Sequence, residues 1–301
     1  MLSFKIITKE NKDQMIDSLT VGMADADLEY ISEIMDSLLE DSDSEYAVCS
    51  SHGCLLVRIF DGRYSFIYPV AVCEEFDESL AAYSLREYAV KEEIPLVYID
   101  VPREELGNLV PLFRHVNMDA QDEDGQFFTV KIMSEVSLLE EIPCVDMGEI
   151  TLDKIVEDDD GLYAALCKDK DTNKFWGYDY SADKESPENS YFREMAENEF
   201  ERGVSIALAV RVNGKFVGEA SLYAFDLLGG CECAVRILPE YRGRGIATGA
   251  LSALRHIAEA MGLLNLYATV DVKNVASKSL FEKCFDEWSF LGDRYRYYAK
   301  L

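Results

Sequence analysis

Apolar and polar residues alternate along several short stretches in the second half of the chain, as is typical of strands with one buried face. The clearest case surrounds Asn213-Gly214, a pair typical of the two-residue turn of a β-hairpin. Longer stretches have the spacing of amphipathic helices. The predicted elements are a strand near 143–150, helices 152–169 and 190–202, strands 205–212, 215–225 and 231–238, helix 246–262, strand 264–272, helix 276–285, and strands 287–291 and 294–300.

The first half of the chain predicts the same order of elements. They are strand 4–8, helices 12–19 and 28–39, strands 46–50, 54–60 and 64–72, helix 77–92, strand 96–101, helix 103–115, and strands 118–121 and 126–133. Residues 134–141 would connect the halves. We therefore expect an α/β (α+β) protein with two domains, residues 1–138 and 139–301, that repeat one fold without repeating its residues.

Composition narrows the function. A chain of 301 residues with 49% hydrophobic and 11% aromatic residues is typical of packed globular domains. The net charge of −28 argues against binding to nucleic acid or anionic membranes. Such a field would attract cations, including amines, polyamines and basic N-termini, although solubility alone is an alternative explanation.

Apolar runs and the spacing of cysteines and histidines indicate where the protein is located and whether it binds a metal. No apolar run reaches the roughly 20 residues of a membrane helix. The first residues are too polar for a signal peptide, so we expect a cytoplasmic protein. Eight scattered cysteines and three histidines show no metal-ligand spacing, so we expect reduced thiols and no metal site.

A glycine-rich turn joins the predicted strand 231–238 to the predicted helix 246–262. It contains Arg242, Gly243, Arg244 and Gly245, followed by Ala247. Small residues let a ligand approach the backbone, and the amides at a helix start favour an anion such as a pyrophosphate. The two arginines would add charge and donors. The spacing matches neither the dinucleotide nor the nucleoside-triphosphate motif, so another pyrophosphate carrier is indicated, with an ordinary loop as the alternative.

The strand, turn and helix together resemble the acyl-CoA-binding motif of the GNAT N-acetyltransferases. The run from Glu232 to Gly245 is similar to the corresponding line of the ribosomal-protein N-acetyltransferase-like branch. Asn274 and Ser277, followed by 281–285, resemble the later conserved segment of the family, except that Phe285 stands where the family has glycine. The resemblance covers residues 146–301. It implies an acetyl-CoA-dependent N-acetyltransferase domain with direct transfer to a primary amine.

For the whole chain, the resemblance implies tandem GNAT-like domains, each with a mixed, mostly antiparallel central sheet, a splayed strand and flanking helices. In the first half, four of the residues at 72–78 are acidic, where the second half has its glycine-rich turn. Carboxylates at that helix start would repel a pyrophosphate. We therefore expect a degenerate GNAT-like domain without CoA binding. It could shape the acceptor cleft or form an oligomer contact, such as a homodimer interface.

The resemblance also implies which residues hold the cofactor. The backbone of Arg236, Ile237 and Leu238 would bond the pantetheine arm and polarise the thioester carbonyl. The pyrophosphate would be held by Arg242, Gly243, Arg244, Gly245, Ile246, Ala247 and Thr248. Asn274 would contact the pantetheine arm, with a helix N-cap as its alternative role.

Catalytic roles follow from the same motifs. Glu232 would be the general base, directly or through water, and its alternative is a surface or ion-paired glutamate. The usual tyrosine acid is replaced by Phe281, which leaves Ser277 or water to protonate the thiolate. Cys233 could act as a nucleophile, but direct transfer requires no acyl-enzyme.

The acceptor amine would bind to a loop that contains aromatic and acidic residues. Trp176, Tyr178 and Asp179 suit an ammonium group through cation–π contact and charge pairing, unless the aromatic rings only pack helices together. The acceptor could be a peptide N-terminus or a small amine. Two other functions stay open: a non-catalytic CoA-binding sensor or assembly module, and transfer of a different acyl or aminoacyl group.

Overall fold

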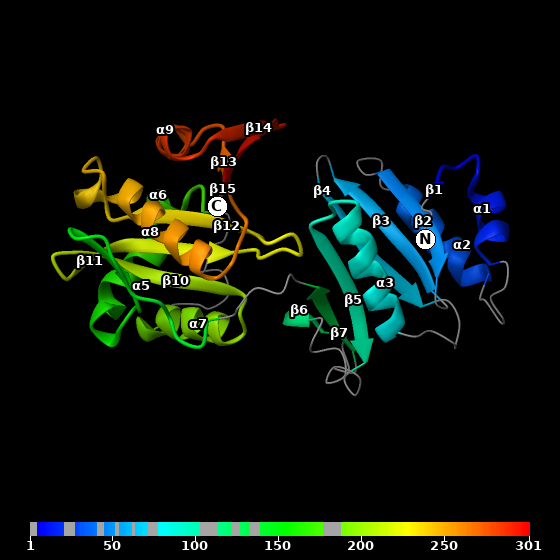
Figure 1. Cartoon of the computed structure of the whole chain (residues 1–301), viewed down its shortest axis with the longest axis horizontal. Coiled ribbons are helices and arrows are strands. Elements are labelled where there is room, and N and C mark those ends of the chain that lie inside the picture. The colour runs from blue at the N-terminus through cyan, green and yellow to red at the C-terminus, as the bar shows by residue number, and fades with distance from the viewer. Residues whose placement is uncertain are drawn as a thin grey trace. The chain divides into compact units, whose positions relative to one another are not determined.

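The computed structural model describes residues 5–20, 28–40, 45–51, 54–61, 64–71, 78–102, 113–121, 127–132, 139–176 and 188–301. The chain divides into two compact units (Figure 1). The first comprises Met1–Ser134 with Asp226–Leu228, and the second comprises Glu135–Phe225 with Gly229–Leu301. Each unit has its own sheet and is described by itself.

The first unit contains a seven-stranded sheet with helices. Its elements are β1 (Lys5–Ile6), α1 (Lys12–Leu19), α2 (Leu28–Glu40), β2 (Glu45–Ser51), β3 (Cys54–Asp61), β4 (Tyr64–Ala71), α3 (Glu78–Lys91), β5 (Leu96–Pro102), β6 (Phe113–Gln121) and β7 (Phe127–Ile132). The strand order is β1-β2-β3-β4-β5-β7-β6, in which β4 and β5 are parallel and the other neighbours are antiparallel.

The prediction of a helix over 103–115 is wrong at its end. Phe113 and His115 lie in β6 and pair with Ile132 and Lys131 of β7, so partners distant in sequence outweigh the local helical pattern. The rest of that predicted helix and the acidic stretch 72–77 lie outside the described residues.

The second unit contains an eight-stranded, mostly antiparallel sheet. Its elements are β8 (Val145–Asp146), β9 (Ile150–Asp153), η1 (Glu157–Asp159), α5 (Asp160–Lys168), α6 (Lys170–Asn173), α7 (Ser190–Glu201), β10 (Ser205–Val212), β11 (Lys215–Tyr223), β12 (Gly230–Ile237), η2 (Pro239–Tyr241), α8 (Ile246–Ala260), β13 (Asn265–Asp271), α9 (Val275–Cys284), β14 (Glu287–Leu291) and β15 (Arg294–Lys300). The strand order is β14-β15-β13-β12-β11-β10-β9-β8, with β12 and β13 parallel.

The helix predicted over 152–169 begins later than expected, at Asp160. Leu152 and Asp153 belong to β9, where they pair with Val210 and Ala209 of β10. A short apolar–polar alternation suits a strand as well as a helix start, and the exposed edge of β10 decides between them.

Strands β9–β15 of the second sheet have the same order as β1–β7 of the first, whereas β8 has no counterpart among the described residues. Each sheet has its parallel pair at the corresponding position. The assignment of the first unit as a degenerate GNAT-like domain nevertheless stays a prediction, as do the domain boundaries at 138 and 139.

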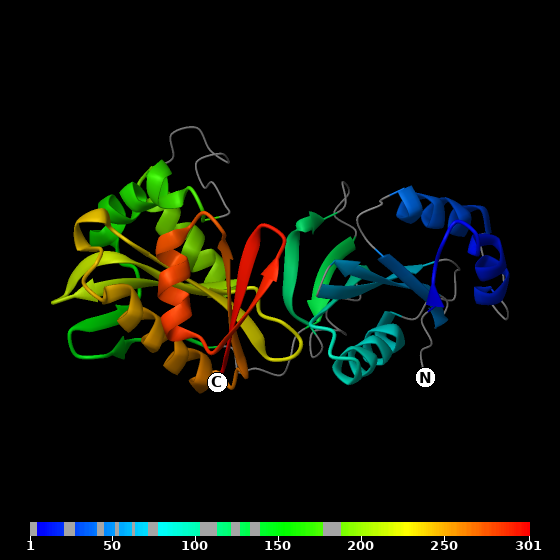
Figure 2. The same ribbon diagram turned by 90° about the horizontal axis from the view of Figure 1, so that it is seen from above.

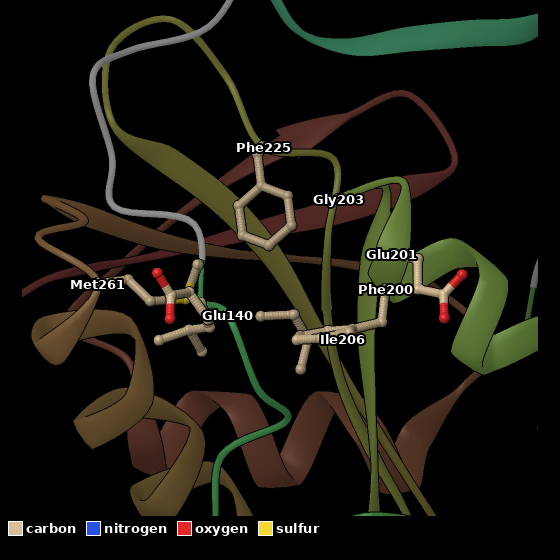
Figure 3. A pocket seen from close by; sticks show the side chains of 8 residues that line it. Glu140, Phe200, Glu201, Gly203, Ile206, Phe225 and Met261 are labelled. Atoms are coloured by element: carbon tan, nitrogen blue, oxygen red, sulfur yellow. The ribbon is translucent and has the colours of Figure 1, made fainter.

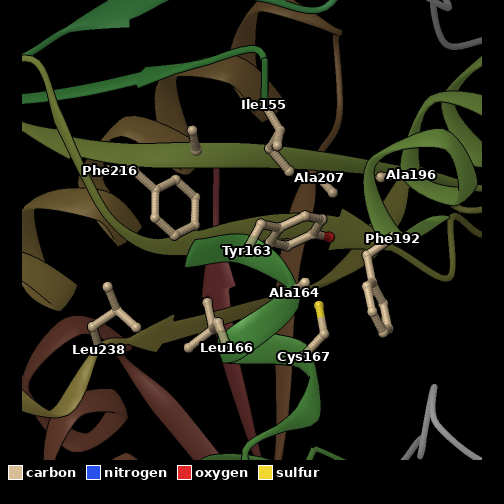
Figure 4. Packing of buried hydrophobic residues seen from close by; sticks show 11 residues of the cluster. Ile155, Tyr163, Ala164, Leu166, Cys167, Phe192, Ala196, Ala207, Phe216 and Leu238 are labelled. Atoms are coloured by element: carbon tan, nitrogen blue, oxygen red, sulfur yellow. The ribbon is translucent and has the colours of Figure 1, made fainter. Parts of the chain in front are cut away.

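Helices cover both faces of the second sheet (Figure 2). On one face, α5 and α7 pack on β10 and β11 around an apolar cluster (Figure 4). The cluster contains Ile155, Tyr163, Ala164, Leu166, Cys167, Phe192, Ala196, Ala207, Ala209, Phe216 and Leu238. The other face is covered by α8 and α9; α8 buries an apolar stripe that includes Leu254 and Ile257. The glycine-rich turn is thereby held between a packed strand and a packed helix.

Candidate active site

Strands β12 and β13 separate after a short contact. Their pairing covers only Gly230–Glu232 against Asn265–Tyr267. Beyond this point β12 stays paired with β11 as far as Ile237, and β13 stays paired with β15 as far as Asp271. The splayed strand predicted for this half is therefore present, and Glu232 is the last residue before the strands diverge.

The edge of β12 that faces the opening can be read from its hydrogen bonds. The Leu238 N–H donates to Val217 O (2.9 Å), on the β11 side. Amide directions alternate along a strand, so Arg236 also bonds toward β11, whereas Ile237 and Val235 direct their amides toward the opening. Of the three backbone positions predicted to bind pantetheine, Ile237 directs its amide toward the opening, and the contacts of all three with pantetheine stay predictions.

The glycine-rich turn has a backbone conformation that other residues rarely adopt. Gly243 and Gly245 have φ of +74° and +79°, in the left-handed region that favours glycine. No atom lies within 4 Å of a Cβ added at either position. The first intrahelical bond of α8 is Gly249 N–H to Gly245 O (3.1 Å), so the three preceding amides have no intrahelical acceptor. Those amides, of Ile246, Ala247 and Thr248, form the start of an anion site.

Both arginines of the turn contact the protein itself. Arg242 donates from Nε to Ile237 O and from Nη2 to Thr172 Oγ1, both at 2.8 Å. Arg244 donates to Glu240 O at 2.7 Å and lies over the Tyr241 ring. These contacts fix the turn at the end of β12. An additional role of the two side chains in anion binding stays a prediction.

Glu232 occupies a polar position among strands β11, β13 and β15. Its carboxylate accepts hydrogen bonds from Thr269 Oγ1 (3.0 Å) and the Tyr223 hydroxyl (3.4 Å), and lies 3.6 Å from Arg296 Nη1. Burial raises the pKa of Glu232, while the two hydrogen bonds favour the ionised form. A carboxyl with a raised pKa at the point of strand divergence has the properties of a general base.

The partners of Glu232 lie outside its own strand, away from it in the sequence. Tyr223, Thr269 and Arg296 come from three different strands, and the only local signal was the alternation of basic and aromatic residues from Arg294 to Tyr298. Since that pattern is also typical of an exposed strand, it did not single out Arg296.

Cys233 lies next to Glu232 but faces a different environment. Its side chain is buried, and burial raises the pKa of its thiol far above the usual range. A protonated, enclosed thiol is a poor nucleophile, so this alternative loses support.

Residues of α9 behave as structural parts of the helix. Asn274 Oδ1 accepts the N–H of Ser277 at 3.1 Å, which makes Asn274 the N-cap. Ser277 is half-buried in the first turn, and its role as an acid stays a prediction. Phe281 is buried and stacks on Tyr297 at 5.8 Å between ring centroids. The Tyr297 hydroxyl is buried without a hydrogen-bond partner among the described residues.

Trp176 stacks on a buried arginine. The guanidinium carbon of Arg236 lies 4.3 Å from the centroid of the indole ring. Arg236 is 4% exposed; its Nε donates to Glu219 Oε2 at 2.8 Å, and it also bonds Asn173 Oδ1 and Cys167 Sγ. Trp176 therefore packs on β12 through Arg236, and its contact with the acceptor stays a prediction. Tyr178 and Asp179 lie outside the described residues.

A cavity of about 280 Å³ opens at another place in this unit. It is lined by Leu139, Glu140, Phe200, Glu201, Gly203, Ile206, Phe225 and Met261 (Figure 3). These residues precede β8, lie at the end of α7 and the start of β10, and follow β11 and α8. The cavity is therefore separate from the glycine-rich turn, which precedes α8. Among the described residues there is no cluster able to hold a metal ion and no helix long and apolar enough to cross a membrane.

Comparison with known families identifies the class of this site. Residues 149–284 match the acetyltransferase (GNAT) domain model. This part of the chain therefore contains a GNAT acetyltransferase domain, as its motifs predict. No curated protein sequence matches the chain significantly.

Solved structures that match about half of the chain include several acetyltransferases. Spermidine N-acetyltransferase from Vibrio cholerae, in complex with CoA and spermine, is 17% identical, with 50% of this chain and 95% of that chain aligned and a TM-score of 0.43. A putative ribosomal-protein-serine acetyltransferase from Vibrio cholerae is 15% identical, with 54% of this chain and 100% of that chain aligned and a TM-score of 0.44. Mycobacterium smegmatis RimJ, in complex with CoA-disulfide, is also 15% identical, with 50% of this chain and 81% of that chain aligned and a TM-score of 0.42.

Proposed function

We propose that the chain is an acetyl-CoA-dependent N-acetyltransferase that moves an acetyl group directly to a primary amine, on a peptide N-terminus or a small molecule. One observation carries the proposal: β12 and β13 separate at Glu232, and the far end of β12 leads into the open glycine-rich turn. A candidate base and a candidate phosphate site therefore lie at the two ends of the β12 edge that is not paired with β13.

The residues of this edge fit an extended thioester cofactor, which supplies an activated acetyl group. The amides of Ile246, Ala247 and Thr248 would hold its pyrophosphate, and those of Ile237 and Val235 would bond its arm and the thioester oxygen. Arg242 and Arg244 would keep the turn in the conformation that binds. Most of this recognition comes from the backbone.

Glu232 would accept a proton from the acceptor ammonium, directly or through one water. The amine nitrogen would then bond the acetyl carbon while the carbon–sulfur bond breaks. The second proton lost by the nitrogen would reach the thiolate sulfur through Ser277 or water, so that CoA leaves as a thiol. The acceptor loop would include Tyr178 and Asp179, with Trp176 at its start. The acidic chain as a whole would favour a cationic acceptor.

We propose further that residues 1–138 form a GNAT-like domain that does not bind CoA and either shapes the acceptor cleft or makes a homodimer contact. The strand order shared with the second unit supports this proposal. We propose a cytoplasmic location.

The first test is thermal unfolding of the full chain with and without acetyl-CoA. A ligand present at 100 times its Kd stabilises the folded state by about 2.7 kcal/mol, so the unfolding midpoint should rise by several degrees. Gly243→Glu should abolish the rise, because it adds a side chain and a negative charge to the cradle.

Gly262→Glu is the matched control. Gly262 follows α8 and has nearly the same φ, +77°, and equally open surroundings. It should carry the same backbone strain yet keep the full response to acetyl-CoA. Loss of the response in both variants, or no response in the wild type, would contradict the cofactor site.

Phe281 favours one alternative, a CoA-binding module without catalysis. Its buried ring stands where many relatives would have a tyrosine acid and cannot donate a proton. In that case the midpoint shift would appear, but no amine would release free CoA thiol, and Glu232→Gln would have no effect on any output.

A further inference from the structure

Arg296 is a buried cation beside the candidate base. It lies in β15 directly opposite Thr269 of β13, the residue that donates to Glu232. Its side chain is 9% exposed, and Nη1 lies 3.6 Å from Glu232 Oε1. Burial lowers the pKa of Arg296 to about 10, which leaves it protonated at neutral pH.

Two tyrosine rings hold this guanidinium in place. Its carbon lies 4.6 Å from the ring centroid of Tyr267 and 5.9 Å from that of Tyr298. The two rings meet edge to face at 5.6 Å, and the Tyr298 hydroxyl lies 3.2 Å from Ser289 Oγ. Since the rings are themselves packed, the cation has little freedom to swing away from Glu232.

We propose that Arg296 is a positioning residue that holds the Glu232 carboxyl in place and in its ionised form, and so sets the lower pH limit of acetyl transfer. The catalytic part of this inference rests on the proposed function. The electrostatic part concerns only the folded protein and can be tested without any substrate.

The groups around Glu232 act in opposite directions. Burial alone would favour a neutral carboxyl, which could not accept a proton. The Tyr223 and Thr269 hydroxyls donate to it from β11 and β13, and Cys233 adjoins it on β12. Two cations come from β15. Arg294 lowers the pKa of Glu232 through its charge, although its side chain is 61% exposed and screened by water. Arg296 is buried, and its Nη1 lies 3.6 Å from the carboxylate.

The experiment measures the Glu232 pKa by 13C NMR of carboxyl-labelled full-length chain, with Glu232→Gln to assign the signal. In Arg296→Met the pKa should rise by about one unit or more, because the nearest cation is lost while burial remains. Arg296→Lys keeps the charge and should restore most of the wild-type value. Arg294→Met, on the same strand, should move the pKa by about half a unit or less.

The same variants connect the pKa to the reaction. The acidic limb of kcat/KM should move to higher pH in Arg296→Met by the amount seen in NMR, since a protonated base is inactive. Far-UV circular dichroism and the unfolding midpoint report whether each variant is folded.

Distinct outcomes separate the two ideas. An unchanged Glu232 pKa in folded Arg296→Met would overturn the inference, as would equal shifts in the Lys and Met variants. If the NMR shift is present but no amine is acetylated at any pH, the proposed function fails and the electrostatic role of Arg296 stands.

Discussion

The two ends of strand β12 carry two different kinds of site. At its start, Glu232 is surrounded by side chains from three strands, and its properties come from their charge and polarity. At its end, the glycine-rich turn presents backbone amides, and its arginine side chains are bonded to the turn and to Thr172. Chemistry at one end should therefore respond to charge, and cofactor binding at the other to backbone conformation.

The largest effect should come from removing the candidate base, Glu232, while leaving the glycine-rich turn intact. Glu232→Gln keeps the size and the hydrogen-bond acceptor but removes the base, so kcat should fall by about 10² to 10⁴. Binding should be unaffected. The assay is release of free CoA thiol, measured together with the acetyl-CoA-dependent unfolding midpoint.

Gly243→Glu should show the opposite pattern, with binding lost and Glu232 unaltered. If Glu232→Gln keeps its activity, the glutamate is only an ion-pair partner of Arg296. If it loses the midpoint shift as well, the two ends are not separable.

The next effect concerns the middle of β12. Glu219 is 2% exposed and pairs with Arg236, so Glu219→Ala would leave a buried guanidinium without its carboxylate. Loss of one partner of a buried pair costs about 3–5 kcal/mol, which denaturant unfolding would measure. Catalysis at the Glu232 end of β12 and acetyl-CoA binding at the glycine-rich end should then both decrease. The reason is that Arg236, in the same strand, also contacts Asn173 and Trp176.

Two control variants test whether the loss of stability in Glu219→Ala comes from the buried, uncompensated charge. Glu259→Ala removes the exposed partner of Arg255 and should cost about 1 kcal/mol or less. The double change Glu219→Leu with Arg236→Met removes both charges and should be less destabilising than Glu219→Ala alone. Equal costs for the single and double changes would show that packing, and not the uncompensated charge, explains the loss.

The smallest effect tests α9. Asn274→Ala removes the N-cap contact with Ser277 and should lower the free energy of unfolding by about 1 kcal/mol, whereas Asn274→Asp should keep the cap. Affinity for acetyl-CoA should hardly change in either variant. A large loss of affinity in both would instead support the predicted contact of Asn274 with the pantetheine arm.

Local patterns predicted much of the second unit. The hairpin around Asn213-Gly214, the glycine-rich turn and helix α8 were all predicted from the sequence, because each depends on residues close in the chain. The helix predicted from 152 was wrong because the pairing of β9 with β10 depends on residues nearly sixty positions away.

The sequence by itself determined where the turn, the hairpin and the candidate base lie, since backbone conformation and hydrophobic period are local properties. Only the tertiary structure decided which side chains meet. It set Arg296 beside Glu232, Glu219 against Arg236, and Cys233 in an enclosed site. Cross-strand neighbours are chosen by sheet order and register, which the pattern of any one strand does not specify.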